Sequence, residues 1–368
     1  MKKLSVLILV CALSLGLVSS ALALIPVGAR NAGMGGCGAA ISNDLTSAYY
    51  NPAGLMRSKM VEGRLGLATN PTGMTEIQEI FSSMSSPADF MSDKFDDEID
   101  ALGTLSGIVG VSFSKIGLSI IPQFLLSANK EADSASGLAM GNGGVTAAIT
   151  AGTSFNVPGL PFATLDVGAN IKSINYMGAS VLAAPVALTY EGTSMTSVGN
   201  GVGLDVGILM DIDIPMVTKL TVGAVIRDMF ETINYTNKTS SVVYDADGNI
   251  TEDYDLGDDE ESSVMPTTTV IGVAGTVPGF GTLLTSDMVV KAGQDHNGDP
   301  NVNDFRFGIE QPLMMGMLNL RAGWATGPEA ATTIGFGFGA GVNVDFAYVI
   351  DGKEAKANSA VLEVSGAF

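Results

Sequence analysis

The sequence predicts an all-β fold, an antiparallel transmembrane outer-membrane β-barrel of about 14 strands. Three observations support this prediction. The chain begins with an export signal, yet no later run of about 18 apolar residues could form a transmembrane helix. Short segments alternate between apolar and polar residues, and the connections between them tend to alternate between long and short. A closed barrel is the other structure that satisfies every backbone hydrogen bond within a bilayer.

Residues 1–23 have the organisation of a secretory signal peptide. Lys2 and Lys3 are followed by the apolar run 4–18, and small residues lead to a cleavage site after Ala23. Val10 precedes Cys11, where a lipoprotein signal would have a small residue, so no lipid anchor is expected. We therefore expect export through a cleaved signal and residence in a Gram-negative type of outer membrane.

The chain is strongly acidic, and this restricts its partners. Its 18 basic and 38 acidic residues give a formal net charge of −20. A surface of this charge argues against nucleic acid as a partner. The lipid bilayer is the partner that the apolar, glycine-rich composition predicts.

Alternation is clearest near the carboxyl terminus. In residues 304–310, Phe305, Phe307 and Ile309 share one face, whereas Asp304 and Arg306 lie on the opposite face. Four later segments show the same period: 316–325, 331–339, 341–350 and 359–368. The apolar set should face lipid and the polar set the lumen.

Candidate strands then cover residues 59–368, and the connections between them test the strand count. The candidates lie near 59–69, 106–115, 117–127, 140–155, 162–175, 199–212, 218–231, 264–276, 282–292, 303–311, 316–325, 331–339, 341–350 and 359–368. The even-numbered connections are short, as expected for periplasmic turns, and most odd ones are long. The two longest are predicted as a helical outer loop at 70–105 and an acidic outer loop at 232–263.

The segment GARNAGMGGCGAAISNDLTSAYYNPAGL, residues 28–55, resembles the amino-terminal signature of the FadL-type hydrophobic-compound transporter superfamily. The resemblance implies a fourteen-stranded barrel whose residues 24–58 fold inward as a lumenal hatch or plug. The motif residues are Gly35, Gly36, Asp44, Tyr49, Tyr50, Asn51, Pro52, Ala53 and Gly54. Glycines allow close packing against the wall, and the residue before a proline is held extended. The same residues could instead form a tightly packed, immobile start to the barrel.

Two groups of residues are candidates for ligand binding. The first is the apolar set of two short amphipathic helices in the 70–105 loop: Ile77, Phe81, Met84, Phe90, Met91 and Phe95. These would form a capture groove, unless they only pack on the barrel rim. The second is Arg306 and Arg321 on the lumen face, which could clamp a carboxylate. The alternative is a ladder of salt bridges between strands, since buried charges must be paired.

Catalysis and metal binding have little support in the sequence. His296 is the only histidine, and Cys37 is the only cysteine after the signal peptide. The mature chain therefore lacks the residues for a zinc site or a disulfide. The acidic stretches 245–249 and 295–304 lack the spacing of calcium loops and read as polar turns. We therefore expect no enzyme activity, no cofactor and no bound metal.

The resemblance implies passive uptake of small hydrophobic molecules, such as fatty acids or hydrocarbons. The alternative is a non-transporting barrel that serves as a scaffold or shuttle for surface or secreted proteins, as in relatives similar to the type IX secretion shuttle protein. A continuous apolar path through the lumen would favour transport. The terminal Phe368 resembles the signal that the barrel assembly machinery reads.

Overall fold

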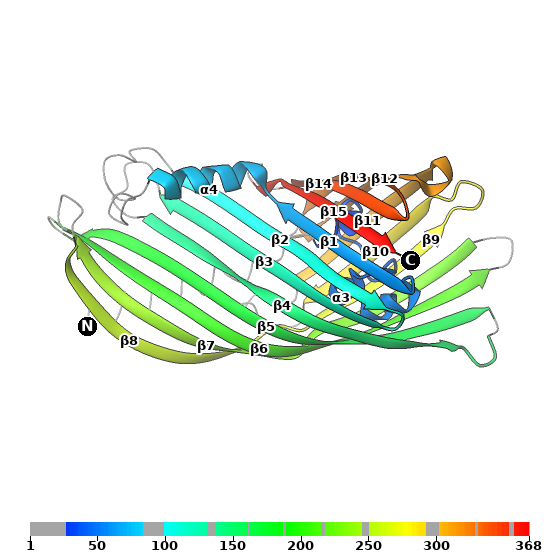
Figure 1. The fold of residues 1–368 in the computed structure, drawn as a ribbon, viewed down its shortest axis with the longest axis horizontal. Helices are drawn as coiled ribbons and strands as arrows, with labels where there is room; N and C mark the ends of the chain where they lie inside the picture. Colours follow the sequence, from blue (N-terminus) through cyan, green and yellow to red (C-terminus); the bar gives the residue numbers. More distant parts are fainter. Residues whose placement is uncertain are drawn as a thin grey trace.

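The computed structural model describes residues 27–83, 99–130, 137–160, 162–186, 189–214, 218–244, 250–291, 302–327, 330–352 and 357–367. These form one antiparallel sheet that closes into a barrel (Figure 1). The predicted signal peptide and Phe368 lie outside the described residues, so the cleavage site and the assembly signal stay predictions.

The described residues contain fifteen strands. Their bounds are β1 Val61–Thr69, β2 Ile99–Phe113, β3 Ile116–Lys130, β4 Gly137–Asn156, β5 Ala163–Val186, β6 Thr189–Ile214, β7 Thr218–Tyr244, β8 Ile250–Val264, β9 Thr268–Thr276, β10 Leu283–Lys291, β11 Val302–Leu313, β12 Leu318–Ala325, β13 Ala331–Ala340, β14 Val342–Asp351 and β15 Ser359–Ala367. The first and last strands pair from Glu62 with Ala367 to Thr69 with Ala360. Pairing of β6 with β7 joins the remaining edges, so the barrel has no free edge there.

Strands β8 and β9 lie end to end along a single neighbour. Strand β7 pairs with β9 over Leu220–Arg227 and with β8 over Thr232–Tyr244. The two strands therefore occupy one position in the barrel, which leaves the fourteen positions that the sequence predicts. Because β7 and β8 continue, together with the paired strands β5 and β6, well beyond β9 to β15, the acidic segment expected as a loop at 232–263 is mostly an extended β-hairpin.

The alternation predicted from the sequence is present in the wall. On β11, Phe305 and Phe307 are exposed on the outside, whereas Asp304 is 1% exposed. On β1, Leu65 and Leu67 face outward and Arg64 is buried. Because the apolar residues point out and the charged residues point in, the wall matches a lipid exterior and a polar lumen.

One helix lies in the region of the predicted helical outer loop. Helix α4 spans Pro71–Ser83 and packs on β2. Asn70 joins them, because its side chain donates to the carbonyl of Leu102 and accepts from the amide of Thr104. Residues 84–98 lie outside the described residues, and Ile99 already begins β2. Among the described residues, no helix is long and apolar enough to cross a membrane.

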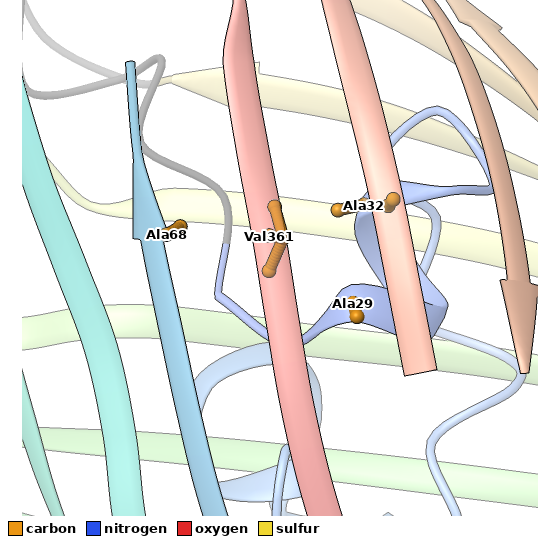
Figure 2. Packing of buried hydrophobic residues seen from close by; sticks show 5 residues of the cluster. Ala29, Ala32, Ala68 and Val361 are labelled. Carbon is orange, nitrogen blue, oxygen red and sulfur yellow. The ribbon is translucent and has the colours of Figure 1, made fainter. Parts of the chain in front are cut away.

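Residues 27–58, which we call the inner segment, lie inside the barrel (Figure 1). This segment contains α2 Ala29–Ala32, α3 Ser47–Tyr50 and the 3-10 helix η2 Pro52–Arg57. Helix α2 packs on β13, β14 and β15. Figure 2 shows Ala29 and Ala32 of this helix near Val361 of β15 and Ala68 of β1, which belong to the same small apolar cluster. Small side chains at this contact let the helix lie close to the wall.

Candidate functional site

Glycines in the wall hold the inner segment at backbone distance. A Cβ atom added to Gly223 would lie 1.9 Å from the carbonyl oxygen of Ala39. A Cβ atom added to Gly323 would lie 2.1 Å from the amide nitrogen of Gly35. Further lumen-facing glycines meet the segment in the same way: Gly168, Gly207, Gly272, Gly308 and Gly335. Any side chain at these positions would therefore push the inner segment away from the wall.

The turn at Asn51 and Pro52 is fixed by side-chain hydrogen bonds to backbone groups. The amide of Asn51 donates to the carbonyl oxygens of Ala39 at 2.7 Å and of Ile208, in β6, at 3.1 Å. Its Oδ1 accepts from the amide of Ala53 and so caps η2. Asn51 is extended, as expected before a proline. This corner joins two parts of the inner segment to the wall at a single residue.

The two tyrosines of the motif have different surroundings. Tyr50 is buried, and its hydroxyl donates to the carbonyl of Val27 at 2.9 Å. Burial raises the pKa of the Tyr50 phenol well above its usual value. Tyr49 is half-buried and lies beneath Arg227 of β7, whose guanidinium carbon is 5.4 Å from the ring centroid. Tyr50 therefore holds the segment together, whereas Tyr49 faces the space above it.

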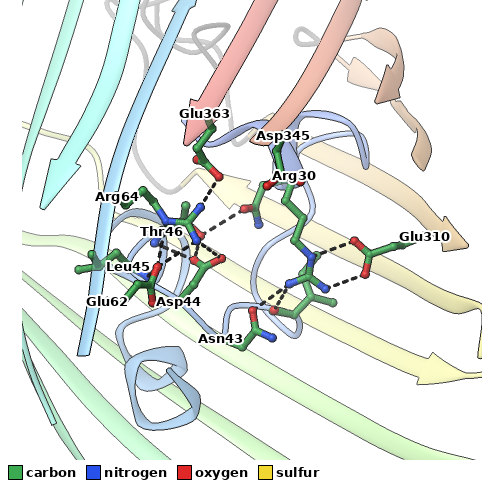
Figure 3. A network of polar contacts seen from close by, with 12 residues as sticks. Arg30, Asn43, Asp44, Leu45, Thr46, Glu62, Arg64, Glu310, Asp345 and Glu363 are labelled. Atoms are coloured by element: carbon green, nitrogen blue, oxygen red, sulfur yellow. Dashed lines mark hydrogen bonds and ion pairs between the residues drawn. The ribbon is translucent and has the colours of Figure 1, made fainter. Parts of the chain in front are cut away.

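A network of charged side chains ties the inner segment to strands from both ends of the chain (Figure 3). Arg30 of α2 forms a two-point ion pair with Glu310 of β11, with both N–O distances at 3.0 Å. Arg321 of β12 lies 2.7 Å from the same Glu310 carboxylate and 2.6 Å from Asp345 of β14, so it links the two acidic groups. Buried charges need such partners because they have left water. The expected salt-bridge ladder is present at these residues.

Asp44 is the second anchor of this network. Its carboxylate lies 2.8 Å from Arg64 of β1 and accepts hydrogen bonds from the Thr46 amide and hydroxyl. Burial alone would raise the pKa of the Asp44 carboxyl, but Arg64 and the bonds from Thr46 bring it below its usual value. Asp44 is therefore held as a carboxylate that fixes the loop before α3.

A cavity of about 740 Å³ lies above the inner segment, on the side of the long strand extensions. Its base is formed by Gly35, Gly36 and Tyr49. Residues from the extensions of β4 to β8 line its walls: Met140, Asn142, Ile174, Tyr176, Met195, Ile233, Tyr235 and Leu256. The cavity therefore runs from the outer part of the barrel to the inner segment, with a mixed apolar and polar surface.

One lysine at the base of the cavity binds three carboxylates. The ammonium of Lys172, on β5, lies 2.9 Å from Asp205 of β6 and 2.8 Å from Glu231 of β7. It also contacts the carboxylate of Asp228. Asn170 joins this cluster to the inner segment, since its amide donates to Asp205 at 3.1 Å and to the carbonyl of Ala48 at 2.7 Å.

The wall is irregular next to this cluster. Residues Asp228 and Phe230 of β7 have φ angles of 61° and 56°, which side-chain-bearing residues rarely adopt. The register with β6 shifts twice at this point, and β8 ends at Val264 before β9 begins at Thr268. Val264 is 72% exposed and also lines the cavity. The cavity therefore approaches the outer surface at the break between β8 and β9.

The structure separates the residues that the sequence proposed for ligand binding. Arg306 lines the cavity and donates to the carbonyl of Gly36 at 3.1 Å. Arg321 is held by Glu310 and Asp345, and the described lining of the cavity does not include it. Residues Ile77 and Phe81 lie in α4, but their side chains, like Met84, Phe90, Met91 and Phe95, are outside what the structure describes. A contact between that loop and the cavity therefore stays a prediction.

Two functional features were not proposed from the sequence. The Lys172 cluster joins three strands, and the sequence alone does not show which charges on β5, β6 and β7 face one another, because the fold sets their pairing register. The irregularity in β7 has only Asp228 and the nearby Pro266 as sequence signs. Two single residues of these types are not enough to predict it. The wall glycines carried a signal, since Gly323 and Gly335 fall on the polar face of alternating segments.

The sequence matches no protein-family model and no curated protein. Solved structures do match: the toluene transporter TodX of Pseudomonas putida aligns over 93% of this chain and 98% of its own, with a TM-score of 0.60 and 12% identity. The chain therefore has the barrel fold of this transporter. The toluene transporter TbuX of Ralstonia pickettii covers 94% of this chain and 99% of its own, at a TM-score of 0.58 and 12% identity. A FadL homologue of Pseudomonas aeruginosa aligns over 93% of this chain and 97% of its own, with a TM-score of 0.56 and 11% identity. The chain therefore has the FadL-type fold.

These alignments confirm the predicted fourteen-position barrel of the outer-membrane type, with an amino-terminal segment in its lumen. At this identity the FadL-type fold is what the likeness establishes. TodX and TbuX are named as toluene transporters, and the likeness establishes no substrate for this chain.

Proposed function

We propose that this chain is a passive uptake channel for small hydrophobic molecules, fatty acids or hydrocarbons, across the outer membrane. The cavity above the inner segment is the observation that carries the proposal. Its volume of about 740 Å³ lies in the range of small-molecule sites, and it reaches from the strand extensions to Tyr49. Methionine and isoleucine side chains contribute apolar surface to its walls, and the methionines can adapt to ligands of different shape.

The route beyond the cavity has two possible directions. Downward, the inner segment fills the lumen and is bound by the Asn51 corner and the Arg30 and Arg64 ion pairs. Sideways, the break between β8 and β9 brings the cavity to the outside of the barrel at Val264. We favour lateral exit, since it leaves the buried charge pairs intact, whose separation would cost several kcal/mol.

A blocked cavity tests the proposal. Ser197 of β6 lines the cavity, whereas Thr196 beside it is exposed outside the barrel. We expect Ser197→Trp to abolish most uptake of radiolabelled toluene and laurate by cells that lack other such channels. The matched variant Thr196→Trp should take up both compounds like the unmodified chain.

Two results would contradict this function. Uptake by Ser197→Trp that equals that of Thr196→Trp would show that molecules do not pass through the cavity. Absence of uptake in cells with the unmodified barrel in their outer membrane would favour the non-transporting scaffold or shuttle.

A further inference from the structure

The cavity has an excess of negative charge. Six residues with carboxylates line its described part: Asp205, Asp228, Glu231, Asp258, Asp259 and Glu261. Four cationic residues line it as well: Lys172, Arg227, Lys291 and Arg306. The balance in the lining therefore favours a positively charged ligand over a negatively charged one.

The cationic side chains are already engaged. Lys172 contacts three carboxylates, and Arg306 donates to the carbonyl of Gly36. Arg227 donates to the carbonyl of Tyr49 at 3.3 Å and lies over its ring. Lys291 also has an interaction within the described structure. A carboxylate ligand would have to displace one of these contacts before it could gain an ion pair.

Aromatic rings and a carboxylate share one level of the cavity. The rings of Tyr176 and Tyr235 are 5.1 Å apart between centroids and nearly perpendicular, at 89°. Glu261 of β8 is paired in register with Tyr235 and lines the cavity beside it. Aromatic rings with a nearby carboxylate form a suitable environment for an organic ammonium group.

One buried amide in the lining has no hydrogen bond among the described residues, and one buried carboxylate shares its cation with two others. Asn142, 5% exposed, has no partner for its Oδ1 or its Nδ2. Glu231, 6% exposed, lies 2.8 Å from Lys172 through Oε2, and it shares this single ammonium with Asp205 and Asp228. An unpaired buried amide is costly, as are several buried carboxylates around one cation. A ligand ammonium could donate to Oδ1 of Asn142 on its way in, and it would supply the second positive charge beside Glu231.

We propose that the cavity binds apolar molecules that carry a protonated amine, with the ammonium at Glu231 and the apolar body against Ile233, Tyr235 and Tyr176. The proposal rests on the proposed uptake function and narrows its substrate class. Asp258 and Asp259 attract the cation at the outer part of the cavity, in register with Asn142, and Glu261 and the two tyrosines contact it further in.

The strand spacing fits a small aromatic amine. Glu231, Ile233 and Tyr235 follow one another at two-residue steps on the inner face of β7, about 7 Å apart along the strand. A phenyl ring on a two-carbon chain covers one such step. Its ammonium can therefore reach the carboxylate of Glu231 while its ring packs on Ile233, next to the ring of Tyr235 one step further along the strand.

Three ligands of similar shape test the charge preference on the unmodified full chain. Phenethylamine, protonated at neutral pH, is compared with uncharged propylbenzene and anionic phenylacetate by equilibrium dialysis against the detergent-solubilised barrel. We expect phenethylamine to bind about tenfold more tightly than propylbenzene, and phenylacetate to bind weakest, because a hydrogen bond to a charged group favours the amine.

A pair of variants locates the contact. Glu231→Gln keeps the shape of the side chain and leaves Lys172 with Asp205 and Asp228. We expect it to lower the ratio of phenethylamine to propylbenzene affinity about tenfold. Glu260→Gln makes the same charge change on β8 at a residue outside the described cavity lining, and it should leave the ratio unchanged.

The outcomes separate this inference from the proposed function. Equal binding of phenethylamine and propylbenzene, tighter binding of phenylacetate, or the same loss in both variants would overturn the amine preference and leave the uptake channel standing. Failure of all three ligands to bind would overturn the proposed function together with the inference. Because the ligand comparison uses the unmodified chain, it decides the question even where Glu231→Gln does not fold.

Discussion

Arg64 of β1 forms an ion pair with Asp44 of the inner segment, with 2.8 Å between Nη2 and Oδ2. The same guanidinium contacts Glu62 on its own strand and Glu363 on β15 (Figure 3). One arginine therefore joins the first strand, the last strand and the inner segment. Barrel closure and the position of the inner segment depend on the same group of charges.

Asp44→Asn should destabilise the folded barrel at neutral pH by about 1–3 kcal/mol, because it removes a charged acceptor from Arg64. The loss is limited, since Glu62 and Glu363 still neutralise the guanidinium. Urea unfolding in lipid vesicles, followed by gel mobility, measures the difference. A variant as stable as the unmodified chain would show that Asp44 contributes no net stabilisation.

The same pair predicts a pH dependence with a definite sign. Because the pKa of Asp44 in the folded chain is below its unfolded value of about 3.9, its contribution is present above that value. The contribution is lost as the pH falls through the lower, folded pKa. The stability difference between the unmodified chain and Asp44→Asn should therefore shrink in acid. A difference that stays constant down to the lowest measurable pH would contradict the assigned ion pair.

Asn51→Ala should loosen the inner segment. The change leaves the Ala53 amide and the Ile208 carbonyl without their side-chain partner, at a cost of about 1–3 kcal/mol. Limited proteolysis after Arg57 or Lys59 measures release of the segment. Asn43→Ala is a suitable control, because Asn43 is exposed and accepts a single bond from Arg30. Equal cleavage of the two variants would argue against a fixed corner at Asn51.

Gly323→Ala should displace the inner segment, since the new Cβ would lie 2.1 Å from the Gly35 amide nitrogen. We expect a larger single-channel conductance in planar bilayers, because the segment would no longer seal against β12. Gly63→Ala on β1 adds a methyl group with no atom within 4 Å and should conduct like the unmodified barrel. Matching conductance in both variants would mean that close packing at Gly323 does not keep the lumen shut.

The sequence predicts the membrane-embedded wall well because lipid imposes one rule on every strand. Phe305 and Phe307 must face outward and Arg306 inward, so alternation is visible residue by residue. Beyond the bilayer, water reaches both faces, and the polar continuation of β7 to Tyr244 carries no alternation. This is why an extended hairpin was expected as an acidic loop.

The cavity was predictable only in part. The motif residues Tyr49 and Asn51 mark the inner segment, because a glycine-rich run ending in Asn-Pro has a recognisable local geometry. The contact of Lys172 with Asp228 depends on two irregular steps between β6 and β7. Such register shifts follow from packing of the whole barrel, and no local pattern of residues encodes them.

Lateral exit predicts a sensitive position at the break in the wall. Val264 ends β8, is exposed on the outside and lines the cavity, so Val264→Trp should narrow the opening and slow toluene uptake severalfold. Ile271→Trp places the same ring on the outer face of β9, away from the cavity, and should not slow uptake. We expect toluene uptake to be slower in Val264→Trp and unchanged in Ile271→Trp. Equal uptake in both variants would indicate that the ligand leaves past the inner segment. In that case Asn51→Ala should accelerate uptake.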